Sequence, residues 1–191
     1  MRLEPLSGAH DDGLWEASRA PDVWRWVREQ PATRQSFKHY LDEARAATAA
    51  GTEFAFATVD ARDGRPIGMT RYLALRPADR GLEIGWTWLA PAAWRTGANV
   101  EAKLLQLGYA FETLGCMRVE LKTHAGNERS RGAMERLGAT FEGIHRKHRL
   151  IPGIGVRDTA WYSVLDDEWP AVRAGLLPRL PTCDRGSATG C

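Results

Sequence analysis

A strand-like run that passes through a glycine turn into a long amphipathic helix constrains this chain more than any other feature. The apolar run Leu82–Leu89 meets Pro91, and the segment Arg95-Thr96-Gly97-Ala98-Asn99 then leads into a helical pattern that extends to Leu114. A helix leaves the N–H groups of its first turn unpaired, and its dipole is positive at that end. The order of strand, glycine turn and helix therefore predicts a phosphate-binding site at the start of this helix.

Composition narrows the class of protein. The chain has 191 residues, 43% of them hydrophobic and 26% charged, which is typical of one globular domain. A net charge of +2 argues little for a nucleic-acid partner. Cys116, Cys183 and Cys191 lack metal-ligand spacing and indicate free thiols in a reducing compartment, with no metal. Neither a signal peptide nor an apolar run of the ~20 residues that a membrane helix needs is evident, so we expect a cytoplasmic protein that does not bind membranes.

Hydrophobic periodicity predicts a single α+β domain with a mixed, mostly antiparallel sheet flanked by helices. Strands are expected at Arg2–Leu6, Glu53–Val59, Pro66–Leu75, Gly81–Leu89, Met117–Thr123, Phe141–Leu150 and Thr159–Leu165, the last two around a Pro152-Gly153 turn. Helices are expected at Leu14–Trp26, with a break at Pro21, and at Gln35–Ala50, with a cap at Thr33 or Ser36. Two more are expected at Asn99–Leu114 and from a cap at Asn127 to Gly138. The helix at Asn99–Leu114 has one apolar stripe, formed by Val100, Leu104, Leu107, Phe111 and Leu114. The domain is predicted to cover residues 1–177, and the Pro-, Gly-, Ser- and Thr-rich segment 178–191 is expected to form a disordered tail.

The glycine turn at Gly97 has two interpretations. It is either an ordinary surface turn that starts a helix or an anion site, and Arg95 favours the second because it adds a cation beside the helix N-terminus. Two other nucleotide-binding patterns are missing from the sequence: neither Gly-x-x-x-x-Gly-Lys-Ser/Thr nor Gly-x-Gly-x-x-Gly after a strand occurs. The sequence therefore argues against an NTPase and a dinucleotide-binding domain.

The order of several short motifs resembles the GNAT superfamily of acetyl-CoA-dependent N-acetyltransferases, and within it the RimJ/RimL-like branch that acetylates ribosomal proteins. The motifs are Glu83-Ile84-Gly85-Trp86, Arg95-Thr96-Gly97-Ala98-Asn99, Ala110-Phe111-Glu112, Asn127-Glu128-Arg129-Ser130, Leu137-Gly138-Ala139, Arg157-Asp158-Thr159 and Glu168-Trp169. The resemblance spans about Leu3 to Trp169 and departs from the usual pattern after Gly97, where a second glycine or alanine is expected.

The resemblance implies an acyl-CoA cleft between a splayed fourth and fifth strand. Backbone groups on the fourth strand would pair with the pantetheine arm, and an N–H there would polarise the thioester carbonyl. The N–H groups of the loop and first helical turn would hold the pyrophosphate, Asn127 would bond the pantetheine, and Arg129 or Arg131 would meet the 3′-phosphate. The implied cofactor residues are Thr87, Trp88, Leu89, Arg95, Thr96, Gly97, Ala98, Asn99, Val100, Asn127 and Arg129.

The reaction needs a base, because the acceptor amine must lose a proton. Glu83 is our candidate, since a carboxylate between Leu82 and Ile84 in a strand requires a reason; a salt bridge to Arg71 is the alternative. His124 is a second candidate base. Ser130 would lie near the thiol as a general acid, unless it is merely a solvated helical residue.

Aromatic residues are expected to line the acceptor side. Trp24, Trp26 and Trp86 would form a wall for an apolar or cationic substrate, and core packing is the alternative. His145 and His148 are expected on a solvated strand face.

The leading functional hypothesis is acetyl transfer from acetyl-CoA to a primary amine by direct attack in a ternary complex. The acceptor would be a small molecule or a protein N-terminus, and a homodimer is compatible with this function. The alternative is a catalytically silent acyl-CoA-binding sensor or scaffold domain, which would need the loop and strand but not Glu83 or Ser130.

Overall fold

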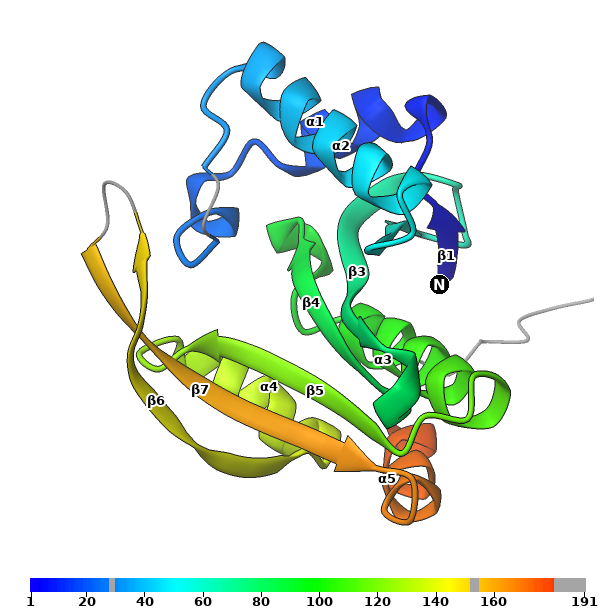
Figure 1. The fold of residues 1–191 in the computed structure, drawn as a ribbon. Coiled ribbons are helices and arrows are strands. Elements are labelled where there is room, and N and C mark those ends of the chain that lie inside the picture. Colours follow the sequence, from blue (N-terminus) through cyan, green and yellow to red (C-terminus); the bar gives the residue numbers. More distant parts are fainter. Residues whose placement is uncertain (28–29, 152–154, 181–191) are drawn as a thin grey trace, which may run out of the picture.

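One mixed seven-stranded sheet organises the chain (Figure 1). The computed structural model describes residues 1–27, 30–151 and 155–180. Strand order is β1-β2-β3-β4-β5-β7-β6, and neighbours are antiparallel except for the parallel pair β4 and β5. The strands are β1 (Arg2–Pro5), β2 (Phe54–Val59), β3 (Pro66–Arg76), β4 (Gly81–Leu89), β5 (Arg118–His124), β6 (Thr140–Ile151) and β7 (Gly155–Leu165). The predicted α+β class is confirmed.

Helices cover the sheet in two groups (Figure 1). The α-helices are α1 (Asp11–Ala17), α2 (Arg34–Ala49), α3 (Ala98–Gly108), α4 (Glu128–Leu137) and α5 (Trp169–Leu176). Helices α1 and α2 bury Leu14 and Phe37 in a core with Met69 of β3, whereas α3, α4 and α5 pack around Leu121 of β5 and Tyr162 of β7. The sheet therefore carries one core near its β2–β3 part and another beside β5 and β7. No helix in the described part of the chain is long and apolar enough to cross a membrane.

Several predicted boundaries differ from the structure. The first helix ends at Ala17, and a 3-10 turn at Pro21–Val23 replaces its second half. Helix α3 continues as a π-helical turn over Tyr109–Thr113, which leaves Leu114, expected on the apolar stripe, half exposed. Helix α5 was not predicted.

The described chain includes a 3-10 turn at Leu177–Arg179, just beyond α5. Residues 181–191, with Cys183 and Cys191, and the Pro152-Gly153 turn lie outside the described residues, so the predicted tail and domain boundary stay predictions. Cys116 is a buried free thiol.

The pair β4 and β5 separates after a short contact. Their register runs only from Gly81 opposite Arg118 to Glu83 opposite Glu120. Further along, a bulge places two β4 residues, Trp86 and Thr87, opposite one β3 residue, because Met69 pairs with Trp88 and Arg71 with Gly85. The bulge bends β4 away from β5, so the predicted splayed pair is present and opens a cleft beyond Glu83.

Candidate active site

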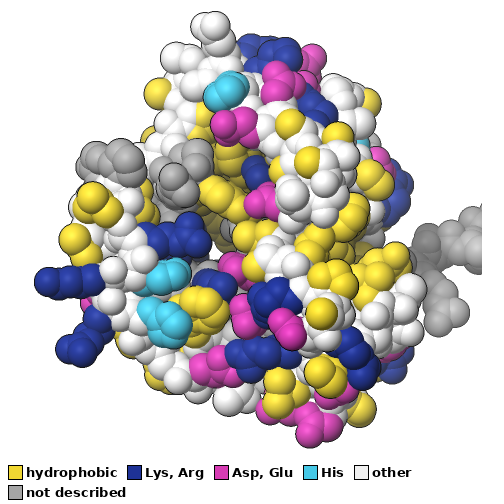
Figure 2. Space-filling model, viewed as in Figure 1, with side chains coloured by type: hydrophobic (Ala, Val, Ile, Leu, Met, Phe, Trp, Pro, Cys, Tyr) yellow, Lys and Arg dark blue, Asp and Glu magenta, His cyan; other side chains and the backbone are white. Residues whose placement is uncertain are grey.

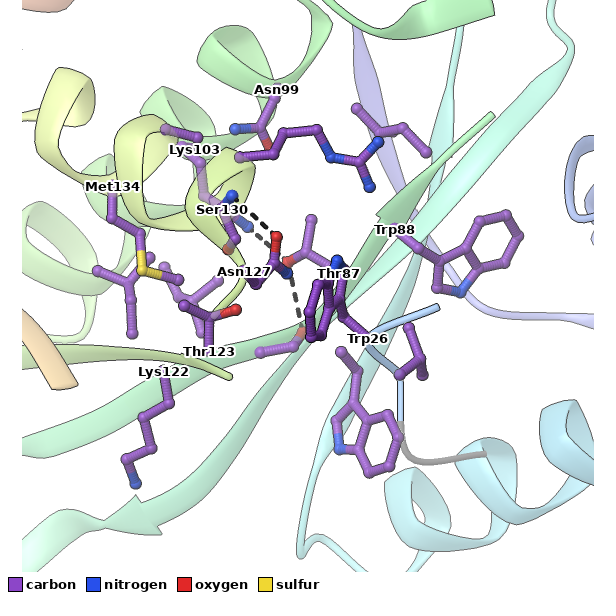
Figure 3. Close-up of a pocket in the computed structure, with 18 of the residues that line it drawn as sticks. Trp26, Thr87, Trp88, Asn99, Lys103, Lys122, Thr123, Asn127, Ser130 and Met134 are labelled. Carbon is purple, nitrogen blue, oxygen red and sulfur yellow. Dashed lines mark hydrogen bonds between the residues drawn. The ribbon is translucent and has the colours of Figure 1, made fainter. Parts of the chain in front are cut away.

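A large cavity lies in the cleft between β4 and β5. It encloses about 1310 Å³, which is more than a drug-sized ligand needs. Its walls come from β4, the loop before α3, the start of α4, and the hairpin of β6 and β7. Figure 3 shows the part of this wall that β4, β5, α3 and α4 supply. Segments far apart in the sequence therefore meet around one elongated space.

The loop before α3 presents backbone donors to this cleft. Gly97 takes the left-handed conformation with φ of 90°, and its carbonyl accepts the N–H of Glu101. The N–H of Ala98 faces the Thr96 hydroxyl at 3.4 Å, and that hydroxyl donates to the Ala93 carbonyl at 2.8 Å. Helix geometry then leaves the next N–H groups, those of 99 and 100, free for an anion. Of the predicted loop residues, Thr96 and Ala98 thus support the turn, whereas the others line the cleft.

Asn127 has a structural task at the start of α4. Its side-chain oxygen accepts the N–H of Ser130 at 3.2 Å and caps the helix, as predicted. Both residues line the cleft (Figure 3), and Asn127 is buried. Because the cap uses the amide oxygen, the amide –NH₂ is the group that Asn127 can offer to a ligand.

Two arginines near α4 differ in their contacts. The Arg129 guanidinium lies 3.8 Å from the centre of the Trp94 ring, so it connects the start of α4 to the loop before α3. The Arg131 guanidinium donates to the Tyr162 hydroxyl at 3.1 Å and to the Ala125 carbonyl at 3.3 Å. Arg129 lines the cleft and Arg131 does not, so only the former is placed for a ligand there.

Glu83 is ion-paired across the gap between the strands. Its carboxylate accepts a hydrogen bond from Lys122 of β5 at 2.8 Å, and Lys122 also lies 3.4 Å from Glu120. The alternative pairing with Arg71 is wrong: Arg71 instead donates to Glu53 at 2.9 Å. In the β3–β4 register Arg71 stands opposite Gly85 and Leu73 opposite Glu83, so Arg71 is a diagonal neighbour of Glu83 whose guanidinium bonds Glu53 instead. Glu83 nonetheless lines the cleft.

His124 is held against Trp26, with ring centres 4.8 Å apart. Its Nδ1 accepts the N–H of Gly126 at 2.9 Å, and burial, reinforced by the charge of Arg157, lowers its pKa. Trp26 is part of the cleft wall but His124 is not. The second candidate base is thus placed behind the wall.

The tryptophan wall is partly different from the one predicted. Trp26 and Trp86 line the cleft, but Trp24 belongs to the core: it is buried against Trp88 and donates to the Ser18 carbonyl at 2.8 Å. Trp88 and Trp94 complete the wall instead. For Trp24 the core-packing interpretation is therefore the correct one.

Lys103 of α3 is the lining residue that the sequence interpretation missed. Only 4% of its surface is exposed, and burial lowers the pKa of its amine to about 7. Its Nζ donates to Thr87 and Gln106 at 2.8 Å and to Thr70 at 3.2 Å. These acceptors are neutral, so this charge is buried without a carboxylate. The amine thereby connects α3 to the bulge of β4 (Figure 3).

One of the two β6 histidines differs from the prediction of a solvated face. His148 is partly buried, lines the cleft and bonds the Thr159 hydroxyl through Nδ1 at 3.0 Å. His145 is exposed and stacks on Trp161 at 4.4 Å. The expectation was thus wrong for His148, which the long β6 strand carries over the cleft.

Comparison with known proteins identifies the family. The model for "Acetyltransferase (GNAT) domain" matches residues 1–140. The chain belongs to the GNAT acetyltransferase family. It is 36% identical over 107 residues to "Putative ribosomal N-acetyltransferase YdaF" of Bacillus subtilis (strain 168), a match that covers 56% of this chain and little more than half, 57%, of that protein. A GCN5-related N-acetyltransferase from Brucella melitensis superposes with a TM-score of 0.88 at 38% identity, over 95% of this chain and 82% of that one. The predicted family is confirmed.

Proposed function

We propose that this GNAT domain transfers an acetyl group from acetyl-CoA to a primary amine, by direct attack in a ternary complex. The observation that carries the proposal is the free edge of β4. Beyond Glu83, β4 has no partner on its β5 side in the described part of the chain, and this edge leads to the first turn of α3. An extended thioester arm that ends in phosphates fits a strand edge followed by a helix N-terminus.

The residues present fit CoA. Free N–H groups of α3 and the nearby cations Arg95 and Arg129 suit the pyrophosphate and 3′-phosphate. Trp88 and Leu89 would offer backbone groups to the pantetheine arm, and Asn127 its amide –NH₂. When bound, acetyl-CoA would supply the activated acetyl group.

Glu83 and Ser130 have separate roles in this proposal. Glu83, held in place by Lys122, accepts the proton of the attacking amine directly or through water. Ser130, at the start of α4, donates a proton toward the leaving sulfur. An α-amine, with an ordinary pKa of about 7.7–8.0, needs less help from a base than a lysine amine near 10.4. A small α-amine or a protein N-terminus is therefore the better-suited acceptor.

The cofactor assignment is tested by calorimetry with CoA on Gly97→Val. A valine side chain is strained at a φ of 90° and blocks close approach of a phosphate, so we expect at least a tenfold loss of affinity. Gly51→Val is the matched control, because Gly51 has a φ of 70° but lies after α2, outside the cleft. Equal CoA affinity in the two folded variants would contradict the assignment.

Asn127 allows its two tasks to be separated. We expect Asn127→Ala to lower the free energy of unfolding by about 1 kcal/mol through loss of the cap and also to weaken CoA binding. Asn127→Asp keeps a capping oxygen but loses the –NH₂ donor, so it should retain stability and still bind CoA more weakly. Chemical denaturation and CoA calorimetry on both variants check this, and normal CoA affinity in Asn127→Asp would remove the ligand role.

The rival function, an acyl-CoA sensor without catalysis, predicts CoA binding without turnover. A screen of amines for thiol release from acetyl-CoA discriminates between the two functions. Amine-dependent release supports the enzyme, whereas tight CoA binding with no release by any amine supports the sensor.

A further inference from the structure

The hairpin of β6 and β7 brings charged residues to the sheet face that lies opposite α4. Along β7, Ala160 and Tyr162 belong to the core under α3, α4 and α5, so the alternate residues Arg157 and Trp161 point to the other face. The Lys122 amine lies 3.5 Å from the centre of the Trp161 ring on this second face, and the same amine holds Glu83. We call this the acceptor face, because the candidate base lies on it.

Two arginines on the acceptor face stand directly opposite each other. Arg149 of β6 pairs in register with Arg157 of β7, and both line the cleft. Like charges directly across a strand pair destabilise the pair. Neither arginine takes part in an ion pair with a described acidic residue. The arrangement therefore costs stability, which the nearby charge of Glu83 offsets only in part.

Of the two arginines, Arg157 gives the stronger evidence that a ligand binds here. Its Nε is buried and has no hydrogen-bond partner among the described residues. Burial lowers the pKa of this guanidinium, the charge of Arg149 lowers it further, and the charge of Glu83 opposes both. A buried hydrogen-bond donor without an acceptor lowers the stability of the fold, unless a ligand supplies the acceptor. His148, bonded to Thr159, adds another polar group to the same wall.

We infer that the acceptor amine carries a carboxylate, which Arg157 and Arg149 bind while the amine faces Glu83. The inference rests on the proposed acetyl transfer. A planar guanidinium binds both oxygens of a carboxylate at once, and a second arginine opposite it completes the charge balance. The cofactor phosphates are the less favoured partner, because α3 and α4, whose first turns would hold them, pack with Ala160 and Tyr162 on the opposite face of β7. Figure 2 shows Lys, Arg and His side chains gathered beside the central hollow.

The test compares pairs of amines in which one member has a carboxylate and the other has an amide in its place. Alanine is paired with alaninamide for a free amino acid, and Ala-Asp-amide with Ala-Asn-amide for a peptide N-terminus. We expect wild-type kcat/KM, measured by thiol release, to favour the carboxylate member of at least one pair by tenfold or more. The pair that shows the preference identifies the source of the carboxylate. No preference in either pair, or a preference for the neutral members, overturns the inference.

Variants then assign the preference to the arginines. Arg157→Gln should lower kcat/KM for the carboxylate member at least tenfold and leave CoA affinity unchanged. Arg146→Gln is the matched control, because it removes the same charge from an exposed site of β6 outside the cleft. A loss of CoA affinity with an unchanged acceptor preference would reassign Arg157 to the cofactor and overturn the inference.

A second readout does not depend on the choice of amine. Because Arg157→Gln relieves the opposed charges, its thermal midpoint should equal or exceed that of wild type, whereas a purely structural arginine predicts a lower midpoint. A different result would contradict the proposed acetyl transfer itself: wild type that binds no CoA, or that releases no thiol with any amine. In the latter case, calorimetry of Ala-Asp-amide and Ala-Asn-amide on the CoA-saturated protein decides, and equal or absent binding of the two peptides overturns the inference.

Discussion

Glu83→Gln is expected to lower kcat by 10²- to 10⁴-fold and leave CoA affinity near that of wild type, because a general base contributes about this much and acts only on the attacking amine. Glutamine keeps the size of the side chain and can still bond Lys122, which lies 2.8 Å from the carboxylate. The pH–rate profile should lose its acidic limb in the variant. Steady-state kinetics across pH, with CoA calorimetry on the same sample, measures both effects.

Glu120→Gln provides a matched control for this experiment. Glu120 stands opposite Glu83 in the β4–β5 register and lies 3.4 Å from the same Lys122, but it does not line the cleft. It should affect stability, through its contacts with Arg76 and Arg118, more than rate. Ser130→Ala should also lower kcat in the folded protein. If Glu83→Gln keeps the wild-type pH–rate profile, the proton leaves through His124 or a water chain instead.

The sequence predicts well those features that depend on neighbouring residues, such as strand bounds and helix caps. The predicted bounds of β4, Gly81–Leu89, match the structure, because the glycine turn before it and Pro91 after it limit the strand on both sides. Asn127 caps α4 and Gly138 ends it in the left-handed conformation, both as predicted from single residues. The site motifs are short, and each belongs to one such local element. Their order along the chain was therefore sufficient to indicate the family.

Contacts across the sheet could not be predicted in this way. The partner of Glu83 comes from β5, 39 positions along the chain, and depends on a parallel pairing that continues for only three residues on each strand. Arg71 is a diagonal neighbour of Glu83 in the β3–β4 register but bonds Glu53, and the choice between these two carboxylates does not follow from alternation. Nothing in the sequence distinguishes Trp24 from Trp26. Trp24 lies in the core because its ring packs against Phe37 and Tyr40 of α2, whereas Trp26 lines the cleft.

Lys103 shows where a usable signal was overlooked. It lies three residues after Val100 and four before Leu107, so it falls on the apolar stripe that was expected to face the core. A lysine on such a stripe either extends to solvent or is buried with its amine bonded to neutral groups. The structure shows the second arrangement, with Thr70, Thr87 and Gln106 as acceptors.

Lys103→Met is expected to change how stability depends on pH. In the unfolded chain the amine keeps its proton up to its ordinary pKa of 10.5, whereas in the folded protein burial lowers the pKa to about 7. Between these values the unfolded state binds more protons, so wild-type stability should rise with pH, by up to about 1.4 kcal/mol per pH unit. Methionine has a similar length and no charge, so the variant should lack this rise.

Urea unfolding of wild type and Lys103→Met between pH 7 and pH 9 measures the two slopes. Lys38→Met is the matched control, because Lys38 is an exposed lysine of α2 that bonds Asp42, and its removal should leave the wild-type slope in place. A rise in the free energy of unfolding that is the same in all three proteins would show that Lys103 keeps its proton in the folded state. In that event its three acceptors outweigh burial, and the amine next to Thr87 is a permanent positive charge beneath the bulge of β4.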